Sequence, residues 1–241
     1  MKTSNKLLLI AILVIIISII TYNLALRKEY RKDIYKSRFY DFEKTTAFNG
    51  FKTIDNRVAN LIYVQVEHGN NSGVWVKNSL KNKIRISLNG TSLIIQPADK
   101  KSRIVKSFET DIIIICPSLE KVTTSPFNMV IVNEDDKYNY GTMTIIGFNQ
   151  QNLDLNLSRT ASLDLFENKI GHLQALVGDN LSDNARFTIN AGNQINEAAI
   201  KVAGKNKLSI ESGNIINKRN FHISDSATVI LSGGYFNSVI K

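Results

Sequence analysis

Two acidic side chains at regular spacing are the first places in this sequence where chemistry could occur. Asp154 and Asp164 lie ten residues apart, and each alternates with leucines in a short strand-like segment. Carboxylates grouped on one face can serve as general acid and general base in carbohydrate chemistry. Alternation with leucine is also typical of solvent-facing positions on a half-buried strand. We therefore expect two exposed carboxylates, and keep a catalytic pair as the alternative.

Residues that bind metals or form reactive groups do not cluster along the chain. The run Glu134-Asp135-Asp136 lacks the spaced oxygen ligands and turn glycine of a calcium loop. The three histidines are scattered, without the paired spacing of zinc ligands, and they are His68, His172 and His222. Cys116 is the single cysteine, so we expect a core residue of an apolar strand rather than a disulfide. No nucleophile elbow, phosphate loop or dinucleotide fingerprint occurs. We assign no catalytic, cofactor-binding or metal-binding residues and expect no cofactor.

The single tryptophan, Trp75, is the residue whose surroundings favour contact with a ligand. It stands between Val74 and Val76 and is out of phase with both. On a strand with the two valines buried, its ring would lie on the opposite face. An exposed ring there could stack against a sugar, so Trp75 is our candidate ligand contact.

Four positions recur at equal intervals near the C-terminus. The recurring sets are Leu181, Val202 and Ile223; Phe187, Leu208 and Val229; Ile189, Ile210 and Leu231; and Gly192, Gly213 and Gly234. Each copy combines an apolar-x-apolar strand with a glycine suited to a corner of the backbone. A fixed period of about 21 residues is typical of stacked coils, in which equivalent positions share one core.

Similar alternating segments continue upstream at steps of about ten residues, including 153–157, 163–165 and 173–177. No convincing helical period occurs after about residue 45. The sequence therefore predicts an all-β fold over residues 47–241, a parallel β-helix or β-solenoid with coils of about 21 residues. An ordinary β-sandwich is the structural alternative.

An apolar segment near the N-terminus predicts a membrane anchor. Residues 7–26 carry no charge, and as a helix they would extend about 30 Å, enough to cross a bilayer. The residues at the end of this segment form a poor cleavage site, so we expect an uncleaved anchor rather than a cleaved signal peptide. The predicted organisation is a tail (1–6), a transmembrane helix (7–26), a juxtamembrane linker (27–46) and the β-solenoid (47–241).

The distribution of charge bears on partners and on orientation. The chain has a net charge of +9, and residues 1–50 contribute nine Lys/Arg against four Asp/Glu. More than half of the excess thus lies in or beside the anchor, and we expect no nucleic-acid binding. Lys and Arg are more numerous after the apolar segment than before it, which would place the domain in the cytoplasm. Polar, Asn-rich β-solenoids are instead typical of surface proteins, so we expect a periplasmic or extracellular domain.

Several segments resemble the bacterial head GIN domain family, whose members are autotransporter-adhesin-like β-helix domains. The resembling segments are Phe51-Lys-Thr-Ile54, Ala59–Gly69, Leu93-Ile-Ile95 and the run Ile112–Leu119 with Pro117. The family's recurring Ser-Gly turns survive as Glu211-Ser-Gly213 and Leu231-Ser-Gly-Gly234. The resemblance spans about residues 48–234 and implies a divergent member: a parallel β-helix, exported or membrane-attached, without an established enzymatic activity.

The functional prediction combines these observations. We expect a single-pass, membrane-anchored, non-enzymatic extracytoplasmic domain that serves adhesion, binding or structural display. Its expected partners are the membrane, through residues 7–26, and a cell-surface polysaccharide or another protein. The alternatives are a carbohydrate-active enzyme of the lyase or hydrolase type and a scaffold that faces the cytoplasm.

Overall fold

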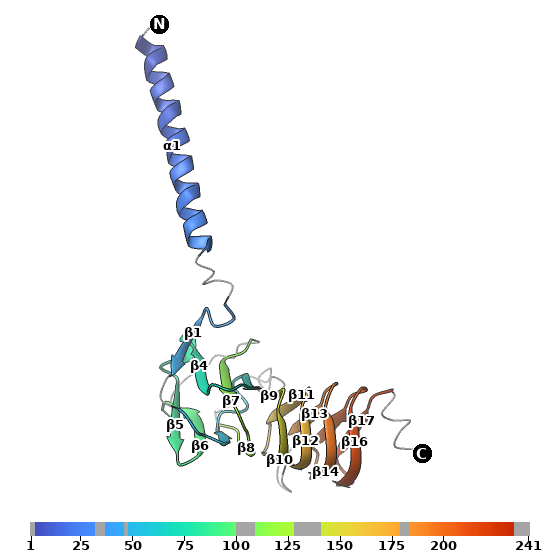
Figure 1. Ribbon diagram of the computed structural model, residues 1–241. Coiled ribbons are helices and arrows are strands. Elements are labelled where there is room, and N and C mark those ends of the chain that lie inside the picture. Colours follow the sequence, from blue (N-terminus) through green and yellow to red (C-terminus); the bar gives the residue numbers. More distant parts are fainter. Residues whose placement is uncertain are drawn as a thin grey trace. The chain divides into compact units, whose positions relative to one another are not determined.

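The computed structural model describes residues 3–31, 37–45, 48–99, 109–127, 141–178 and 184–233. The chain divides into two compact units, Met1–Phe42 and Glu43–Lys241. The first unit contains a helix, and the second contains the β-sheets (Figure 1).

The helix of the first unit, α1 (Thr3–Arg31), is long and apolar enough to cross a membrane, a property that signal sequences near an N-terminus share. Two of its polar side chains bond to backbone groups of the same helix. The Thr21 hydroxyl donates to the carbonyl of Ile17, and the Asn23 amide donates to that of Ile19 at 3.0 Å. Satisfying polar groups within the helix suits an apolar environment, where no water is available to do so.

The second unit consists of two mixed β-sheets in the part of the chain that the structure describes. The nine-stranded sheet has the order β1 (Phe42–Thr45), β4 (Gly73–Lys77), β7 (Ile112–Cys116), β3 (Val64–His68), β9 (Thr142–Ile146), β11 (Ser162–Phe166), β13 (Arg186–Ile189), β15 (Lys207–Ile210), β17 (Thr228–Leu231). The eight-stranded sheet has the order β16 (Ile215–Ile223), β14 (Gln194–Val202), β12 (Lys169–Val177), β10 (Asn149–Leu157), β8 (Lys121–Thr124), β2 (Thr53–Asn56), β6 (Ser92–Pro97), β5 (Ile84–Asn89). A short 3-10 helix, η2 (Asn78–Leu80), follows β4.

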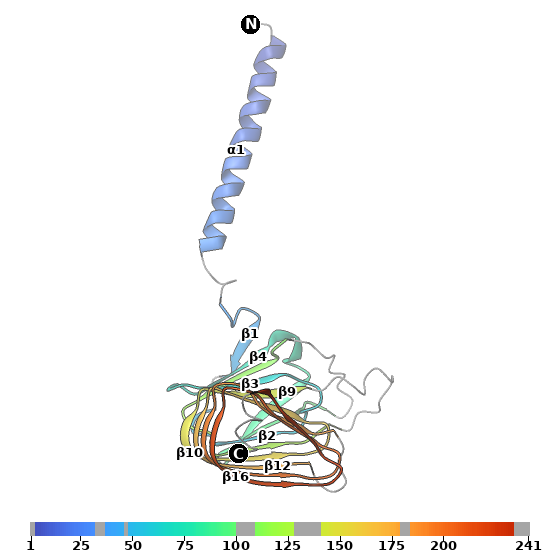
Figure 2. The same cartoon turned by 90° about the vertical axis from the view of Figure 1, so that its right-hand side faces the viewer.

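From β9 onward the chain alternates between the two sheets, and from β10 onward each new strand pairs in parallel with the strand two before it. Figure 1 shows β10, β12, β14 and β16 side by side in one sheet, and Figure 2 views these strands along the direction in which they succeed one another. Side chains that alternate along these strands are buried between the sheets in one core, as Leu163 and Leu165 on β11 are, both at 0% exposure. The opposite residues on each strand face outward.

The predicted fold class, an all-β solenoid built of equal coils, is wrong. Helix α1 is consistent with the helical part of the prediction, but the described strands form two large mixed sheets, in which β4 pairs antiparallel with β7 and β5 pairs antiparallel with β6. The spacing between partner residues also changes along the chain, since Leu153 pairs with Leu173 but Leu173 pairs with Ala198. Between the paired residues Val64 on β3 and Met143 on β9, the described residues form five other strands. Apolar alternation indicates which face of a strand is buried, but it does not specify the neighbouring strand, because insertions between strands leave the alternation unchanged.

A ladder of asparagines occupies the turns before β12, β14 and β16. Asn168 donates from Nδ2 to Oδ1 of Asn193 at 3.0 Å, and Asn193 donates to Oδ1 of Asn214 at 3.3 Å. Asn168 and Asn193 are completely buried, and their amides also bond to backbone groups of the turns. The ladder therefore satisfies polar groups that the turns would otherwise bury unpaired.

Candidate functional site

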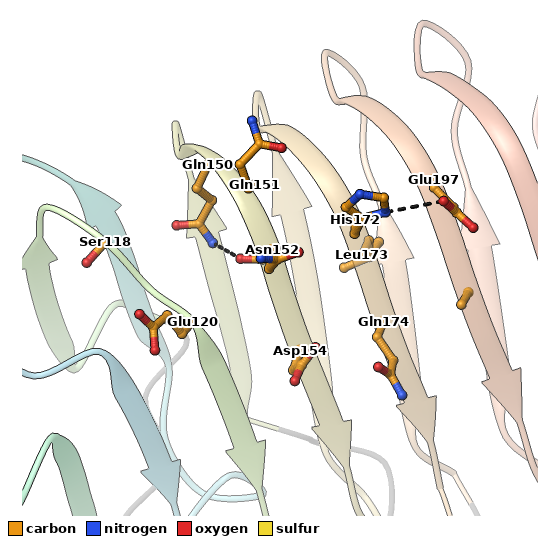
Figure 3. A pocket seen from close by; sticks show the side chains of 11 residues that line it. Ser118, Glu120, Gln150, Gln151, Asn152, Asp154, His172, Leu173, Gln174 and Glu197 are labelled. Atoms are coloured by element: carbon orange, nitrogen blue, oxygen red, sulfur yellow. Dashed lines mark hydrogen bonds and ion pairs between the residues drawn. The ribbon is translucent and has the colours of Figure 1, made fainter.

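A groove of about 630 Å³ crosses the outer face of the eight-stranded sheet, over β10, β12, β14 and the residues that precede β8 (Figure 3). Its polar side chains come from neighbouring strands and from the residues that precede β8. These polar side chains include Glu120, Asn152, Asp154, His172, Gln174 and Glu197.

Alternation along the strands aims these side chains outward. On β10, Leu153 and Leu155 point into the core with exposures of 0% and 3%, so Asn152 and Asp154 lie on the outer face. On β12, the buried Leu173 separates His172 from Gln174 in the same way. The parallel register then aligns these outward side chains across the sheet.

Two rows of side chains result, each running across the strands. Asn152 pairs in register with His172, and His172 with Glu197. In the second row, Asp154 pairs with Gln174, and Gln174 with Ala199. Neighbouring strands lie about 4.8 Å apart, so the first row offers hydrogen-bonding groups at that interval on three strands, and the second on two strands before Ala199.

Gln150 holds one wall of the groove in place. Its Nε2 donates to the carbonyls of Asn152 at 2.8 Å and of Leu119 at 2.5 Å, and its Oε1 accepts from the Leu119 amide at 3.1 Å. At the same end Glu120 forms an ion pair with Lys52 at 2.7 Å. The bonds of Gln150 fasten the segment before β8 to the start of β10, and the ion pair joins the same segment to the residue before β2.

The remaining groove side chains are available to a ligand. His172 Nδ1 lies 3.2 Å from Oε2 of Glu197, in a pair whose side chains are 59% and 42% exposed. The side chains of Asn152, Asp154 and Gln174 make no hydrogen bond within the described part of the chain. The groove thus presents amides, carboxylates and one imidazole to solvent.

The two aspartates that the sequence singled out do not share a face. Asp154 lies in the groove on β10, whereas Asp164 lies on β11 of the nine-stranded sheet. Burial raises the pKa of Asp164, against a hydrogen bond with Thr188 that lowers it. The structure therefore brings Asp154 together with Glu120 and Glu197, which the sequence had not grouped with it.

Trp75 lies apart from the groove, on β4 of the nine-stranded sheet. Its ring covers Gly73, where an added Cβ would come within 2.5 Å of a ring carbon. Lys44 Nζ lies 5.1 Å from the ring centroid, a cation–π distance. The candidate ligand contact is thus a partly buried ring with neighbours of its own, and its role in binding stays a prediction.

The described residues of the repeating sequence pattern lie in the core, on the last strands of the two sheets, or at glycines with positive φ. Those in the core are Phe187, Ile189, Val202, Leu208 and Ile210, each at most 1% exposed. On the last strands of the two sheets, Ile223 and Val229 are 37% and 38% exposed and Leu231 is partly buried. Gly192 and Gly213 have φ values of +87° and +84°, a backbone conformation that favours glycine. Leu181 and Gly234 lie outside the described residues, as does the acidic run Glu134-Asp135-Asp136.

The histidines have different surroundings. His172 belongs to the groove, His222 lies on β16, and His68 meets the ring of Phe148 edge-on at 5.7 Å. No group of three or more potential metal ligands occurs among the residues that the structure describes.

Cys116 is expected to resist thiol reagents in the native protein. It is completely buried on β7, and burial raises the pKa of its thiol to about 12. At pH 8 a thiol with this pKa has a thiolate fraction about a thousandfold below that of a free cysteine. Titration with an aromatic disulfide reagent should show negligible reaction without denaturant and one thiol per chain in concentrated urea. Rapid stoichiometric labelling of the native protein would contradict the buried placement.

Comparisons with known proteins give limited similarity. No family model matches the sequence, and a search of curated proteins gives no match. Among solved structures, a putative adhesin from Bacteroides fragilis has 10% identity and a TM-score of 0.44, over 79% of this chain and 95% of that one. A putative lipid binding protein from Parabacteroides distasonis has 11% identity and a TM-score of 0.37, over 80% and 97% of the two chains.

A second putative adhesin, from Parabacteroides merdae, has 14% identity and a TM-score of 0.36, over 80% of this chain and 95% of that one. The structural neighbours thus include adhesin-like proteins, at an identity and TM-score too low to transfer a function. Membership of the GIN domain family in particular stays a prediction.

Proposed function

We propose that this chain is a membrane-anchored, non-enzymatic binding domain that holds a polar ligand on the extracytoplasmic side of the membrane. The observation that carries the proposal is the groove on the eight-stranded sheet, with its two aligned rows of outward polar side chains. Helix α1 supports the anchored part, because its length and composition suit a membrane span.

The surroundings of the groove side chains favour binding over catalysis. A catalytic acid or base is normally poised by burial and by specific charged neighbours. The contact of His172 with Glu197 is open to solvent on both sides, with exposures of 59% and 42%. Open, hydrated groups of this kind suit reversible hydrogen bonding to a ligand.

Reporter fusions and protease digestion can test on which side of the membrane the domain lies. A C-terminal fusion to alkaline phosphatase should be active in cells, because this enzyme folds only after export. Protease added to cells with a permeable outer layer should digest the domain and spare a reporter fused to the N-terminus. An inactive C-terminal fusion together with a protected domain would contradict the proposal and favour the scaffold that faces the cytoplasm.

Binding through the groove is testable with the full-length chain in nanodiscs. A panel of polysaccharides and peptides is first tested for a ligand that the native chain binds. The doubly substituted variant Asn152→Ala/Asp154→Ala should not bind this ligand. Ser209→Ala, on the other sheet, is the matched control and should bind normally. Release of shortened or unsaturated sugar products by the native chain would contradict the non-enzymatic part of the proposal.

A further inference from the structure

We infer that the ligand of the groove is an extended glycan without acidic groups, whose chain runs across the strands at about one sugar residue per strand. This inference rests on the proposed function and adds the chemical class and direction of the ligand.

The chemistry of the lining favours hydroxyl groups as partners. Amides such as those of Asn152 and Gln174 both donate and accept hydrogen bonds, and carboxylates such as Asp154 accept them. Sugar hydroxyls likewise donate and accept, so each can satisfy a neighbouring amide and carboxylate together. The groove lining contains such groups from at least three neighbouring strands.

The charge of the groove excludes acidic ligands. Its lining includes Glu120, Asp154 and Glu197 but no lysine or arginine, although the whole chain has a net charge of +9. Glu120 is paired with Lys52, so Asp154 and Glu197 are the carboxylates that repel phosphates, uronates and nucleic acid at close range in this groove. A neutral glycan, or one that carries amines, meets no such repulsion.

The spacing of the rows sets the direction of the chain. Equivalent side chains repeat across the sheet at about 4.8 Å, the distance between neighbouring strands. This interval is close to the advance per pyranose residue in an extended β-linked glycan. A chain perpendicular to the strands would therefore place successive sugars beside successive strands, namely at Asn152, His172 and Glu197 in the first row.

The path continues beyond the first groove. A second hollow of about 500 Å³ shares Asp154, Gln174 and Ala199 with it and extends over β16 to Asn220 and His222. Its lining also includes Lys121 and Lys201, so the repulsion of acidic ligands applies to the first groove. The polar surface thus spans five strands, β8 to β16, in the direction that an extended glycan would follow.

A peptide fits this surface less well than a glycan. Extended peptides commonly bind by adding a strand to a sheet edge, whereas the groove lies over the middle of the eight-stranded sheet.

The test uses the full-length chain in nanodiscs and isothermal titration calorimetry. The probes are β-1,4-linked dimers to hexamers of glucose, N-acetylglucosamine and mannose, with a galacturonate hexamer as the acidic probe. At least one neutral series should bind, with an affinity that rises with length up to about five sugars, and the galacturonate should not bind. Asn152→Ala and Gln174→Ala should each weaken binding about fivefold to tenfold, the effect of one net hydrogen bond. Ser209→Ala, outside the groove, should leave it unchanged.

The outcomes separate this inference from the proposed function. If no neutral glycan binds, or if galacturonate binds more tightly, the inference is overturned. The proposed function still stands in that case if another polar ligand binds and is lost in Asn152→Ala and Gln174→Ala. Binding that neither substitution weakens would overturn both.

Discussion

Replacing Asn193 with alanine is expected to lower the free energy of unfolding by about 3–5 kcal/mol, because it leaves several buried polar groups without partners. Asn193 Oδ1 accepts from the backbone N–H and from Nδ2 of Asn168, both at 3.0 Å. Its own Nδ2 donates to the carbonyls of Leu165 at 3.0 Å and Asn190 at 2.5 Å. A buried group that loses its partner costs about 1–3 kcal/mol, and partial relaxation keeps the total below the simple sum.

Urea denaturation of the full-length chain in detergent measures this effect through tryptophan fluorescence, since Trp75 is the single tryptophan. Asn217→Ala is the matched control. Its Nδ2 donates to Oδ1 of Asn196 at 3.2 Å, but both residues are exposed, and the cost should stay below about 0.5 kcal/mol. An Asn193→Ala variant no less stable than Asn217→Ala would show that the ladder contributes little.

The sequence predicted which residues of each strand are buried better than it predicted which strands pair in the sheets. Leu163, Leu165, Phe187 and Leu208 follow the expected alternation and lie in the core. The alternation reports only local contrast between the two faces of a strand, so it could not place β3 beside β9 or make β4 antiparallel to β7. Strand pairing depends on contacts between segments far apart in the chain.

The groove could not be predicted from the sequence either, although one of its residues was identified there. Asp154 was identified as an outward residue, but its partners in the groove depend on register between strands. The spacing from Asn152 to His172 is shorter than the spacing from His172 to Glu197, which hides the rows from a search for a constant period. The ladder gave a local clue, since Asn168, Asn193 and Asn214 each stand directly before a long strand.

Replacing Gly141 with alanine is expected to destabilise the protein by about 3 kcal/mol, the upper part of the range for overpacking. Gly141 is buried at the start of β9, where that strand begins to pair with β3. An added Cβ would collide with the carbonyl oxygen of Ile62 and would lie 2.6 Å from that of Ala59. These are backbone atoms, so the clash cannot be relieved by rotating a side chain.

The backbone against Gly141 is held by hydrogen bonds of its own. The Ala59 amide donates to the carbonyl of Ser125 at 3.1 Å, and the Leu61 amide donates to that of Val58 at 2.9 Å. A shift that accommodates the methyl group would strain these bonds and the pairing of β3 with β9. The loss of stability therefore arises where β3 pairs with β9, the point at which the regularly alternating strands begin.

Gly69→Ala is a matched control for this prediction. An added Cβ there would meet Ile115 Cγ2 at 2.5 Å, and the next atom lies 4.0 Å away. A side-chain methyl can move aside, so the cost should be about 1 kcal/mol or less. Both substitutions reduce the freedom of the unfolded chain equally, and the difference between their urea midpoints isolates the backbone clash. Equal stabilities of the two variants would contradict the close approach of β9 to the Ala59–Ile62 segment.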